Sequence, residues 1–374
     1  MDPKERLAAL RLHLASGVGP RLFTALVDCF GSAADAATAS CANLAQVPGI
    51  GRVKAGRIHE AIRQADPDGE LDQAADGGAR VLIRGETNYP VPLAYLADAP
   101  PVLYVKGTLE PEDAQAMTLV GTRRCSLYGQ DQAERLAGGL ARAGFTVVSG
   151  LARGIDSAAH RGALAAGGRT LAVLGNGLGT VYPPENASLA SAVIERGALV
   201  SEFPMGMGPS AENFPRRNRI LAALALGTVV VEAGRRSGAL ITARFAAEIG
   251  KEIFAVPNRV DAPAAAGAHA LIRDGATLVE TVTDILDAFP DLAIASPSGE
   301  DGPHQASLDL KANLSPEEAR LLEALDDDPA PVDVLAERSG LAVARLSGAL
   351  TLLELKGLVR SLPGGRFLRR RRRQ

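Results

Sequence analysis

A repeated alternation of short apolar strands, glycine-rich turns and helices runs through the middle of the chain and constrains its fold more than any other feature. Strand candidates such as Met117–Val120 and Thr146–Ser149 alternate with helical stretches such as Gln130–Ala143 and Ile155–Ala166. Strands that are apolar along their whole length are typical of a parallel sheet covered by helices on both faces. The pattern predicts an α/β fold, with an extended Rossmann-like parallel sheet domain over residues 79–289.

The segment before this domain has a different pattern. Residues 1–68 contain two Gly-x-Gly turns, in SGVGPRLF from Ser16 and in VPGIGRVK from Val47, and an apolar helical stretch follows each. We expect a helical SAM-like or helix-hairpin-helix domain here. Its turn amides either hold a DNA phosphate or only permit the chain to turn, and the sequence leaves both alternatives open.

The segment after it divides into three parts. Residues 290–313 are rich in proline, serine and glycine, which indicates a linker. Residues 314–368 have the pattern of three amphipathic helices and a hairpin, which is typical of a winged-helix domain. Residues 369–374 form a poly-arginine tail.

Charge and cysteine content argue against a chain that is basic overall, a cysteine metal site and a disulfide framework. The net charge is −3 at pH 7 despite the arginine run at the end, so any site for a polyanion must be local. Cys29, Cys41 and Cys125 are scattered without ligand spacing, which predicts no metal site and no disulfide framework. Because we find neither a signal-peptide pattern nor an apolar stretch of spanning length, we expect a cytoplasmic protein without membrane contact.

Arginines cluster in the turns that follow the predicted strands. VGTRRCSLYG carries Arg123 and Arg124, and SGLARGID carries Arg153. EFPMGMGPSAENFPRRNRI ends in three more arginines, at the expected start of a helix led by Pro215. A cation at a helix N-terminus is repelled by the positive end of the helix dipole. A bound anion removes this conflict, because backbone N–H groups and guanidinium groups can then bind one phosphate together. The turns therefore predict an anion site. The alternative is that some of these arginines form ion pairs within the chain, with Glu202, Glu232 or Glu248.

Aromatic side chains stand in or beside the same turns. Aromatic rings that alternate with arginines stack on the bases of single-stranded nucleic acid, although an isolated phenylalanine more often packs in a core. Phe214, directly before Pro215 and the arginines, is the best stacking candidate. The others are Tyr128, Tyr182 and Phe203.

No pattern of catalytic residues accompanies these turns. The chain lacks the GxxxxGK[ST] pattern of a P-loop, and GRRSG at Gly234–Gly238 has the wrong spacing for a nucleophile elbow. His160 lies in a motif, but a single histidine on a helix is more often a packed side chain than a catalyst. We therefore expect a binding protein and no enzyme, with no catalytic residue, metal or cofactor.

Four of these stretches together resemble the DNA-processing protein A family (DprA, also called Smf). They are SGLARGIDSAAHRGAL, LGNGLGTVYPPEN, FPRRNRI and VVVEAGRRSGALITARFAAEIGKEIFAVP, all within about residues 80–288. The resemblance implies a recombination mediator that binds incoming single-stranded DNA and loads the RecA recombinase in natural transformation. It also implies a homodimer formed through the Rossmann-like domain.

The resemblance also implies site residues. It places a DNA-contacting arginine at Arg123 and further contacts in the turns around Gly150 and Arg217, whereas Glu185 stands where some members have a DNA-contacting lysine. With the turns described above, the predicted DNA-binding residues are Gly121, Arg123, Arg124, Ser149, Gly150, Arg153, Gly154, Asp156, Gly175, Gly177, Phe214, Arg216, Arg217, Asn218, Arg219, Ser237 and Gly238.

Two other functions compete with this interpretation. Nucleoside monophosphate phosphoribohydrolases of the LOG type are similar in fold, but EAGRRSGALITA lacks their PGG-x-GT turn and the catalytic glutamate that follows it. A winged-helix regulator of duplex DNA is the third possibility. The expected recognition helix, Leu341–Lys356, has only Arg345 and Lys356 as cations, so protein docking is the preferred role for that domain.

Overall fold

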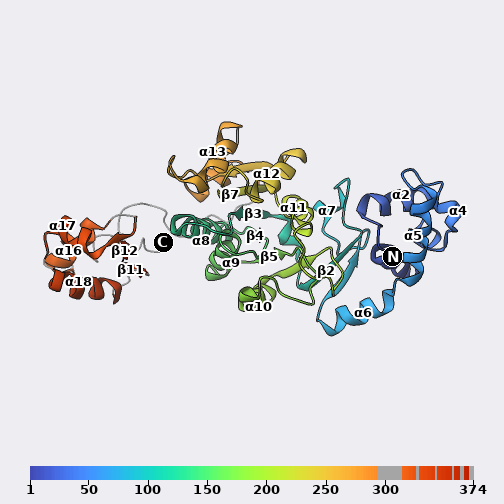
Figure 1. Ribbon diagram of the computed structural model, residues 1–374, viewed down its shortest axis with the longest axis horizontal. Helices are drawn as coiled ribbons and strands as arrows, with labels where there is room; N and C mark the ends of the chain where they lie inside the picture. The colour runs from blue at the N-terminus through green and yellow to red at the C-terminus, as the bar shows by residue number, and fades with distance from the viewer. Residues whose placement is uncertain are drawn as a thin grey trace. The chain divides into compact units, whose positions relative to one another are not determined.

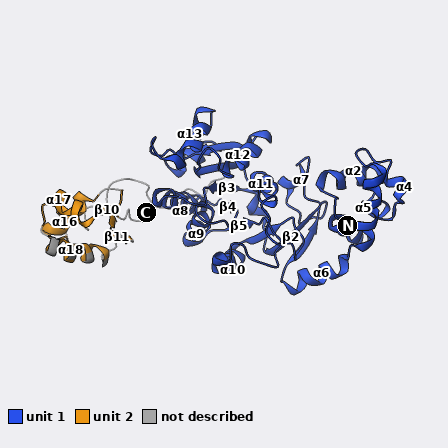
Figure 2. Cartoon of the chain, viewed as in Figure 1, with its two compact units in different colours: residues 1–296 blue, residues 297–374 orange. Residues whose placement is uncertain are grey.

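Residues 1–296 and 297–374 form two separate compact units in the computed structural model (Figure 2). The structure describes residues 1–290, 292, 314–325, 328–341, 343–355, 358–362 and 366–369. Most of the expected linker and residues 370–374 of the arginine tail lie outside the described residues.

The first unit begins with a cluster of helices. Glycines form the N-caps of two of them, Gly19 and Gly51, and each follows a glycine with a positive φ, Gly17 at 88° and Gly49 at 82°. Side chains of the cluster such as Leu26 share one hydrophobic core with residues of the sheet. The helices are α1 (Pro3–Leu14), α2 (Pro20–Phe30), α3 (Ala33–Thr38), α4 (Cys41–Leu44), α5 (Arg52–Gln64) and α6 (Pro67–Asp76).

Polar contacts also join this cluster to the sheet part of the same unit. Arg6 forms an ion pair with Glu86 at 2.9 Å, and the backbone N–H of Met205 donates to Glu70 at 2.7 Å. Because the helices and the sheet share a core within one compact unit, the separate domains that we predict over 1–68 and 79–289 stay a prediction.

The rest of this unit is built around a nine-stranded sheet, in the order β1-β2-β6-β5-β4-β3-β7-β8-β9. Figure 1 labels β7, β3, β4 and β5, which are neighbours in that order. The neighbours from β6 to β9 pair in parallel, which confirms the expected α/β fold. The strands are β1 (Arg80–Ile83), β2 (Val102–Gly107), β3 (Ala116–Gly121), β4 (Thr146–Ser149), β5 (Thr170–Val173), β6 (Ala198–Ser201), β7 (Gly227–Glu232), β8 (Glu252–Ala255) and β9 (Thr277–Leu278).

The first two strands depart from the expected repeat. β1 pairs with β2 and β2 with β6 in antiparallel fashion. The only helix between β1 and β2 is α7 (Val91–Ala94), a single turn. Parallel neighbours are usually joined by a crossover that contains a full helix, and this link contains none, in keeping with the antiparallel return of the chain.

Helices cover both faces of the sheet, and alternate side chains of each strand face opposite layers. Leu119 of β3 packs with α8 and α9, whereas Val120 packs with α11 and α12. Thr118, on the same face as Val120, donates to the Leu221 carbonyl at 2.7 Å. These helices are α8 (Leu127–Arg142), α9 (Ile155–Ala165), α10 (Ala187–Arg196), α11 (Asn213–Leu224), α12 (Ala239–Glu248), α13 (Ala266–Arg273) and α14 (Val282–Leu286).

The second unit is a small winged helix with its own core, which includes Leu321, Leu335 and Leu353. Ser315 and Glu318 form a capping box at its first described helix. Its helices are α16 (Pro316–Ala324), α17 (Val332–Ser339) and α18 (Val343–Leu355), and its strands β10 (Ala330–Pro331), β11 (Val359–Leu362) and β12 (Arg366–Arg369) form an antiparallel sheet. Among the described residues of both units, no helix combines the length and the apolar character needed to span a membrane.

Candidate nucleic-acid interface

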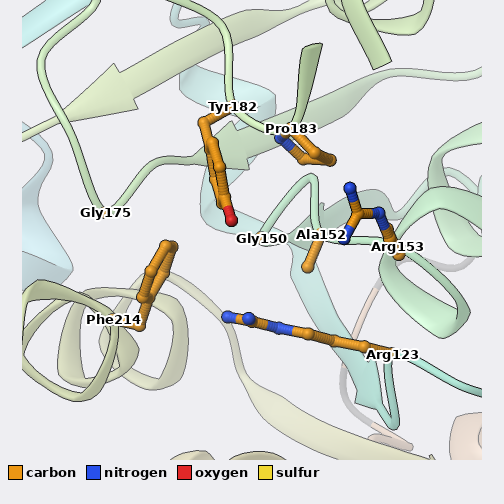
Figure 3. A pocket seen from close by; sticks show the side chains of 8 residues that line it. All are labelled: Arg123, Gly150, Ala152, Arg153, Gly175, Tyr182, Pro183 and Phe214. Carbon is orange, nitrogen blue, oxygen red and sulfur yellow. The ribbon is translucent and has the colours of Figure 1, made fainter. Parts of the chain in front are cut away.

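A pocket opens at the carboxyl ends of β3, β4 and β5. In a doubly wound sheet, ligands bind at this edge, close to the point where the strand order reverses. Here the reversal lies at β3, because the chain proceeds from β3 through β6 on one side and continues with β7 on the other. The pocket is open to solvent and is lined by Arg123, Gly150, Ala152, Arg153, Gly175, Tyr182, Pro183 and Phe214 (Figure 3).

A cation and two aromatic rings converge inside this pocket (Figure 3). The guanidinium carbon of Arg123 lies 4.8 Å from the centre of the Phe214 ring, which is cation–π geometry. The rings of Phe214 and Tyr182 lie 5.9 Å apart between centres and are tilted by 40°. A Cβ atom at Gly175 would lie only 2.7 Å from Cδ1 of Phe214, so this glycine leaves space for the ring.

Arg153 lies on the rim of the pocket and forms an ion pair with Glu185. Both side chains are exposed, to 57% and 49%. The hydrogen bond between them raises the pKa of Arg153 and lowers the pKa of Glu185. The turn after β5 therefore places a carboxylate against a cation of the turn after β4.

Arg217 lies beneath the pocket, with only 4% of its surface exposed. Its guanidinium donates to the carbonyl of Gly150 at 2.9 Å and to the carbonyl of Val173. Burial lowers the pKa of Arg217 to about 10, against the opposing field of Asp156. Burial also raises the pKa of Asp156, which Arg217 and two backbone N–H groups counteract. Arg217 therefore ties the turns after β4 and β5 together from below.

Arg219 has its partners within the chain as well. It forms ion pairs with Glu202 and, at 3.5 Å, with Asp98, and 6% of its side chain is exposed. Burial raises the pKa of Glu202, and the charge of Arg219 opposes that shift. The alternative of internal ion pairs thus holds for Arg219, and Glu202 is its main partner.

The third arginine of the same helix remains accessible. The Arg216 side chain is exposed, and its guanidinium carbon lies 5.3 Å from the centre of the Phe203 ring. These differences follow from the faces of α11. The helix starts at Asn213, two residues before Pro215, and Phe214, Arg216, Arg217 and Arg219 are all helical residues. Most faces of this helix are buried, which takes Arg217 and Arg219 out of solvent.

The pocket brings together five of the predicted site residues: Arg123, Gly150, Arg153, Gly175 and Phe214. The other predicted residues do not line it. They are Gly121, Arg124, Ser149, Gly154, Asp156, Gly177, Arg216, Arg217, Asn218, Arg219, Ser237 and Gly238. Ala152 and Pro183 also line the pocket; they lie in the stretches that carry the resemblance but are not among the predicted site residues. Tyr182 lines it as one of the aromatic candidates.

Several of the residues outside the pocket shape its turns. Ser149 donates to the carbonyl of Leu119 at 2.6 Å and links β4 to β3. Gly154, with a φ of 76°, packs against the carbonyl of Thr122 and caps α9. Asn218 donates to the carbonyl of Gly238 at 3.2 Å. Arg124 is exposed, and its backbone N–H donates to Thr122 at 3.2 Å.

Glu232, at the end of β7, is buried and accepts hydrogen bonds from the turn after β3. Its carboxylate accepts from the backbone N–H of Ser126 at 2.8 Å and from the Ser126 hydroxyl at 2.9 Å. Asn258 donates to it at 3.2 Å. Within the described part of the chain, no group of three or more histidine, cysteine or carboxylate side chains is arranged to hold a metal ion.

Comparisons with known proteins cover all three segments. Residues 80–290 match the family model of DNA recombination-mediator protein A, residues 305–365 the DprA winged helix domain, and residues 10–64 a SAM-like helix-hairpin-helix tandem. Protein Smf of Escherichia coli is 42% identical over 76% of this chain and 75% of its own length. Protein Smf of Synechocystis is 32% identical over 99% and 100%.

Two solved structures are similar. DprA from Streptococcus pneumoniae superposes with a TM-score of 0.67 at 32% identity, over 76% of this chain and 98% of that one. DprA from Helicobacter pylori, whose structure was described for its single-stranded DNA binding mode, gives a TM-score of 0.51 at 27% identity, over 56% and 94%.

Proposed function

Because this chain belongs to the DNA recombination-mediator protein A family, we propose that it binds single-stranded DNA in the pocket at the ends of β3, β4 and β5. The observation that carries the proposal is the approach of Arg123 to Phe214 inside that pocket. A nucleotide has an anionic phosphate and a flat base, and a guanidinium beside an aromatic ring offers one partner for each.

The accessible arginines support the proposal that this pocket binds DNA. Arg123, Arg124 and Arg216 are exposed, and within the described residues none of them has a carboxylate partner. We assign phosphate contacts to these three. Phe214 and Tyr182 provide the surface on which a base stacks.

The buried arginines have a different role in this proposal. Moving Arg217 to a phosphate would leave the carbonyls of Gly150 and Val173 without their donor, in a place that water does not reach. We propose that Arg217 and Arg219 position the turns, and that DNA does not contact them directly.

The finer parts of the function extend the same proposal. We propose that the bound strand is passed to the RecA recombinase during natural transformation, in the cytoplasm, and that the chain acts as a homodimer. Two linked pockets would raise the affinity for one strand through effective concentration. Because the sequence has no nucleotide-hydrolysis motif, binding free energy alone would drive the loading, without an enzymatic step.

A salt series of binding measurements tests the proposal. Fluorescence anisotropy of a labelled oligothymidine should show tighter binding than that of a duplex of equal length. Arg123→Ala should weaken binding and flatten the log–log salt dependence by about 0.7, the share of one phosphate contact on a single strand. Arg142→Ala is the control, because it removes an equal charge from the last turn of α8, away from the carboxyl ends of the strands. Preference for the duplex, or equal effects of both variants, would contradict the proposal.

A further inference from the structure

The ion pair between Arg153 and Glu185 is the strongest charged contact at the pocket that the proposed function does not use. Arg153 lines the pocket, and its guanidinium is already hydrogen-bonded to the Glu185 carboxylate. A carboxylate and a phosphate present the same charge and similar oxygen geometry to a guanidinium. Glu185 therefore takes up the Nε–H of Arg153 and offsets the charge that a DNA phosphate would otherwise meet.

Buried hydrogen bonds hold the two side chains next to each other. Glu185 belongs to η2 (Pro184–Asn186), a 3₁₀ turn. Asn186, next to it, donates to the carbonyl of Leu151 at 2.8 Å and to the hydroxyl of Ser157 at 2.9 Å. Ser157 in turn donates to the carbonyl of Ala152 at 2.6 Å. This network fixes η2 on the turn that carries Arg153, so the position of Glu185 is set by the interior of the protein.

We propose that Glu185 competes with DNA phosphate for Arg153. This competition weakens the binding of the strand, and it keeps Arg153 from contributing to the salt dependence of binding. The inference rests on the proposed function and deepens it. Exposed ion pairs contribute little free energy, so removing the carboxylate should change the affinity by only a modest factor. While Glu185 stays beside Arg153, the two charges cancel and this position neutralises no phosphate.

The test measures oligothymidine binding over a salt series for four proteins: the wild type, Glu185→Gln, Arg153→Gln and the double variant. Glu185→Gln should tighten binding about threefold at low salt. It should also steepen the log–log salt dependence by about 0.7, because one more phosphate is then neutralised. Arg153→Gln should have little effect in the wild type and should remove the whole gain in the Glu185→Gln background.

A second carboxylate separates this contact from net charge. Glu112 is exposed in η1 (Pro111–Ala114). Because η1 precedes β3, it lies near the amino ends of the strands, whereas the pocket lies at their carboxyl ends. Glu112→Gln changes the net charge equally and should leave affinity and salt dependence unchanged. An equal gain from Glu112→Gln, or a gain from Glu185→Gln that survives Arg153→Gln, would overturn the proposal.

Three further outcomes also decide it. A loss of affinity in Glu185→Gln would overturn the inference, since the carboxylate would then be a contact to the strand. If the wild type binds the oligonucleotide and Glu185→Gln matches it, the inference alone fails. If the wild type does not bind at all, the proposed function fails and the inference fails with it.

Discussion

Arg217 lies beneath the pocket with a buried charge whose partners are all within the chain. It donates to the carbonyl of Gly150 in the turn after β4 and to that of Val173 at the end of β5, and Asp156 is the acidic group that opposes the shift of its pKa. Gly150 has no side chain because a Cβ there would collide with both Arg217 and Asp156. The side chains that form the floor of the pocket therefore depend on one another.

This dependence predicts a large loss of stability from one substitution. Arg217→Ala should lower the free energy of unfolding by about 3 kcal/mol, because it leaves Asp156 buried without its counter-charge and two carbonyls without a donor. Urea denaturation measures the difference. Arg216→Ala, one residue away but exposed, should change it by less than about 0.5 kcal/mol. Similar values for both variants would show that Arg217 does not support the turns.

A second residue tests the stacking surface. In Gly175→Ala the new methyl group would press on the ring of Phe214 and displace it from the pocket. Because stacking of a base on an aromatic ring contributes about 1–3 kcal/mol, oligothymidine binding should weaken at least about fivefold. Gly208→Ala, in open space, is the matched control and should bind as the wild type does. Unchanged affinity in Gly175→Ala would exclude Phe214 as a stacking surface.

At the scale of elements, α9 packs on β5 through a buried histidine. Nδ1 of His160 lies 2.7 Å from the hydroxyl of Thr170, which itself donates to the carbonyl of Val147. Nδ1 must therefore carry the hydrogen, and Nε2 remains buried without a partner within the described residues. Burial, together with the nearby charge of Arg217, lowers the pKa of His160 to about 3.

This contact predicts acid sensitivity. Below the ordinary histidine pKa of 6.5 the unfolded chain binds a proton that the folded chain does not, so stability falls as the pH falls. Between pH 7 and pH 5 this one group should cost about 2 kcal/mol. Urea unfolding at both pH values measures the loss in the free energy of unfolding between pH 7 and pH 5. This loss should be smaller by that amount in His160→Gln than in the wild type. An equal drop in both proteins would mean that His160 is protonated in the folded state.

The elements themselves were predictable to different extents. The parallel strands and their helices follow from apolar runs between glycine turns, and these were expected correctly. The start of α11 was not, because Pro215 suggested that the helix begins there. Proline is tolerated throughout the first turn of a helix, and α11 begins two residues earlier, at Asn213. Arg217 and Arg219 are helical from either start, so their burial follows from the packing of α11 and not from the shift.

At the scale of the whole molecule, each of the two units has a core of its own. The pocket is formed entirely by residues of the first unit. The second unit has the winged-helix fold, and the described part of α18 carries a single cation, Arg345, which forms an ion pair with Glu317 at 2.8 Å. This arrangement favours a role for the second unit other than holding the strand.

A truncated protein tests this division. A chain that ends at residue 296 should keep its oligothymidine affinity within about twofold, because the pocket and the core beneath it are complete in the first unit. Anisotropy at fixed salt measures this, with circular dichroism as the check that the first unit is folded. Complete loss of binding by a folded truncated chain would move the site to the winged helix or to the arginine tail.

The amino-acid sequence by itself determined that strands and helices alternate, that the turns after them gather at one edge, and that arginines and aromatic rings lie in those turns. These are local patterns of spacing and polarity. Only the tertiary structure decided which arginines face a ligand, because their partners come from distant parts of the chain. Gly150 is 67 residues from Arg217, and Glu185 is 32 residues from Arg153. Whether a guanidinium is free, paired or buried depends on what the fold places against it.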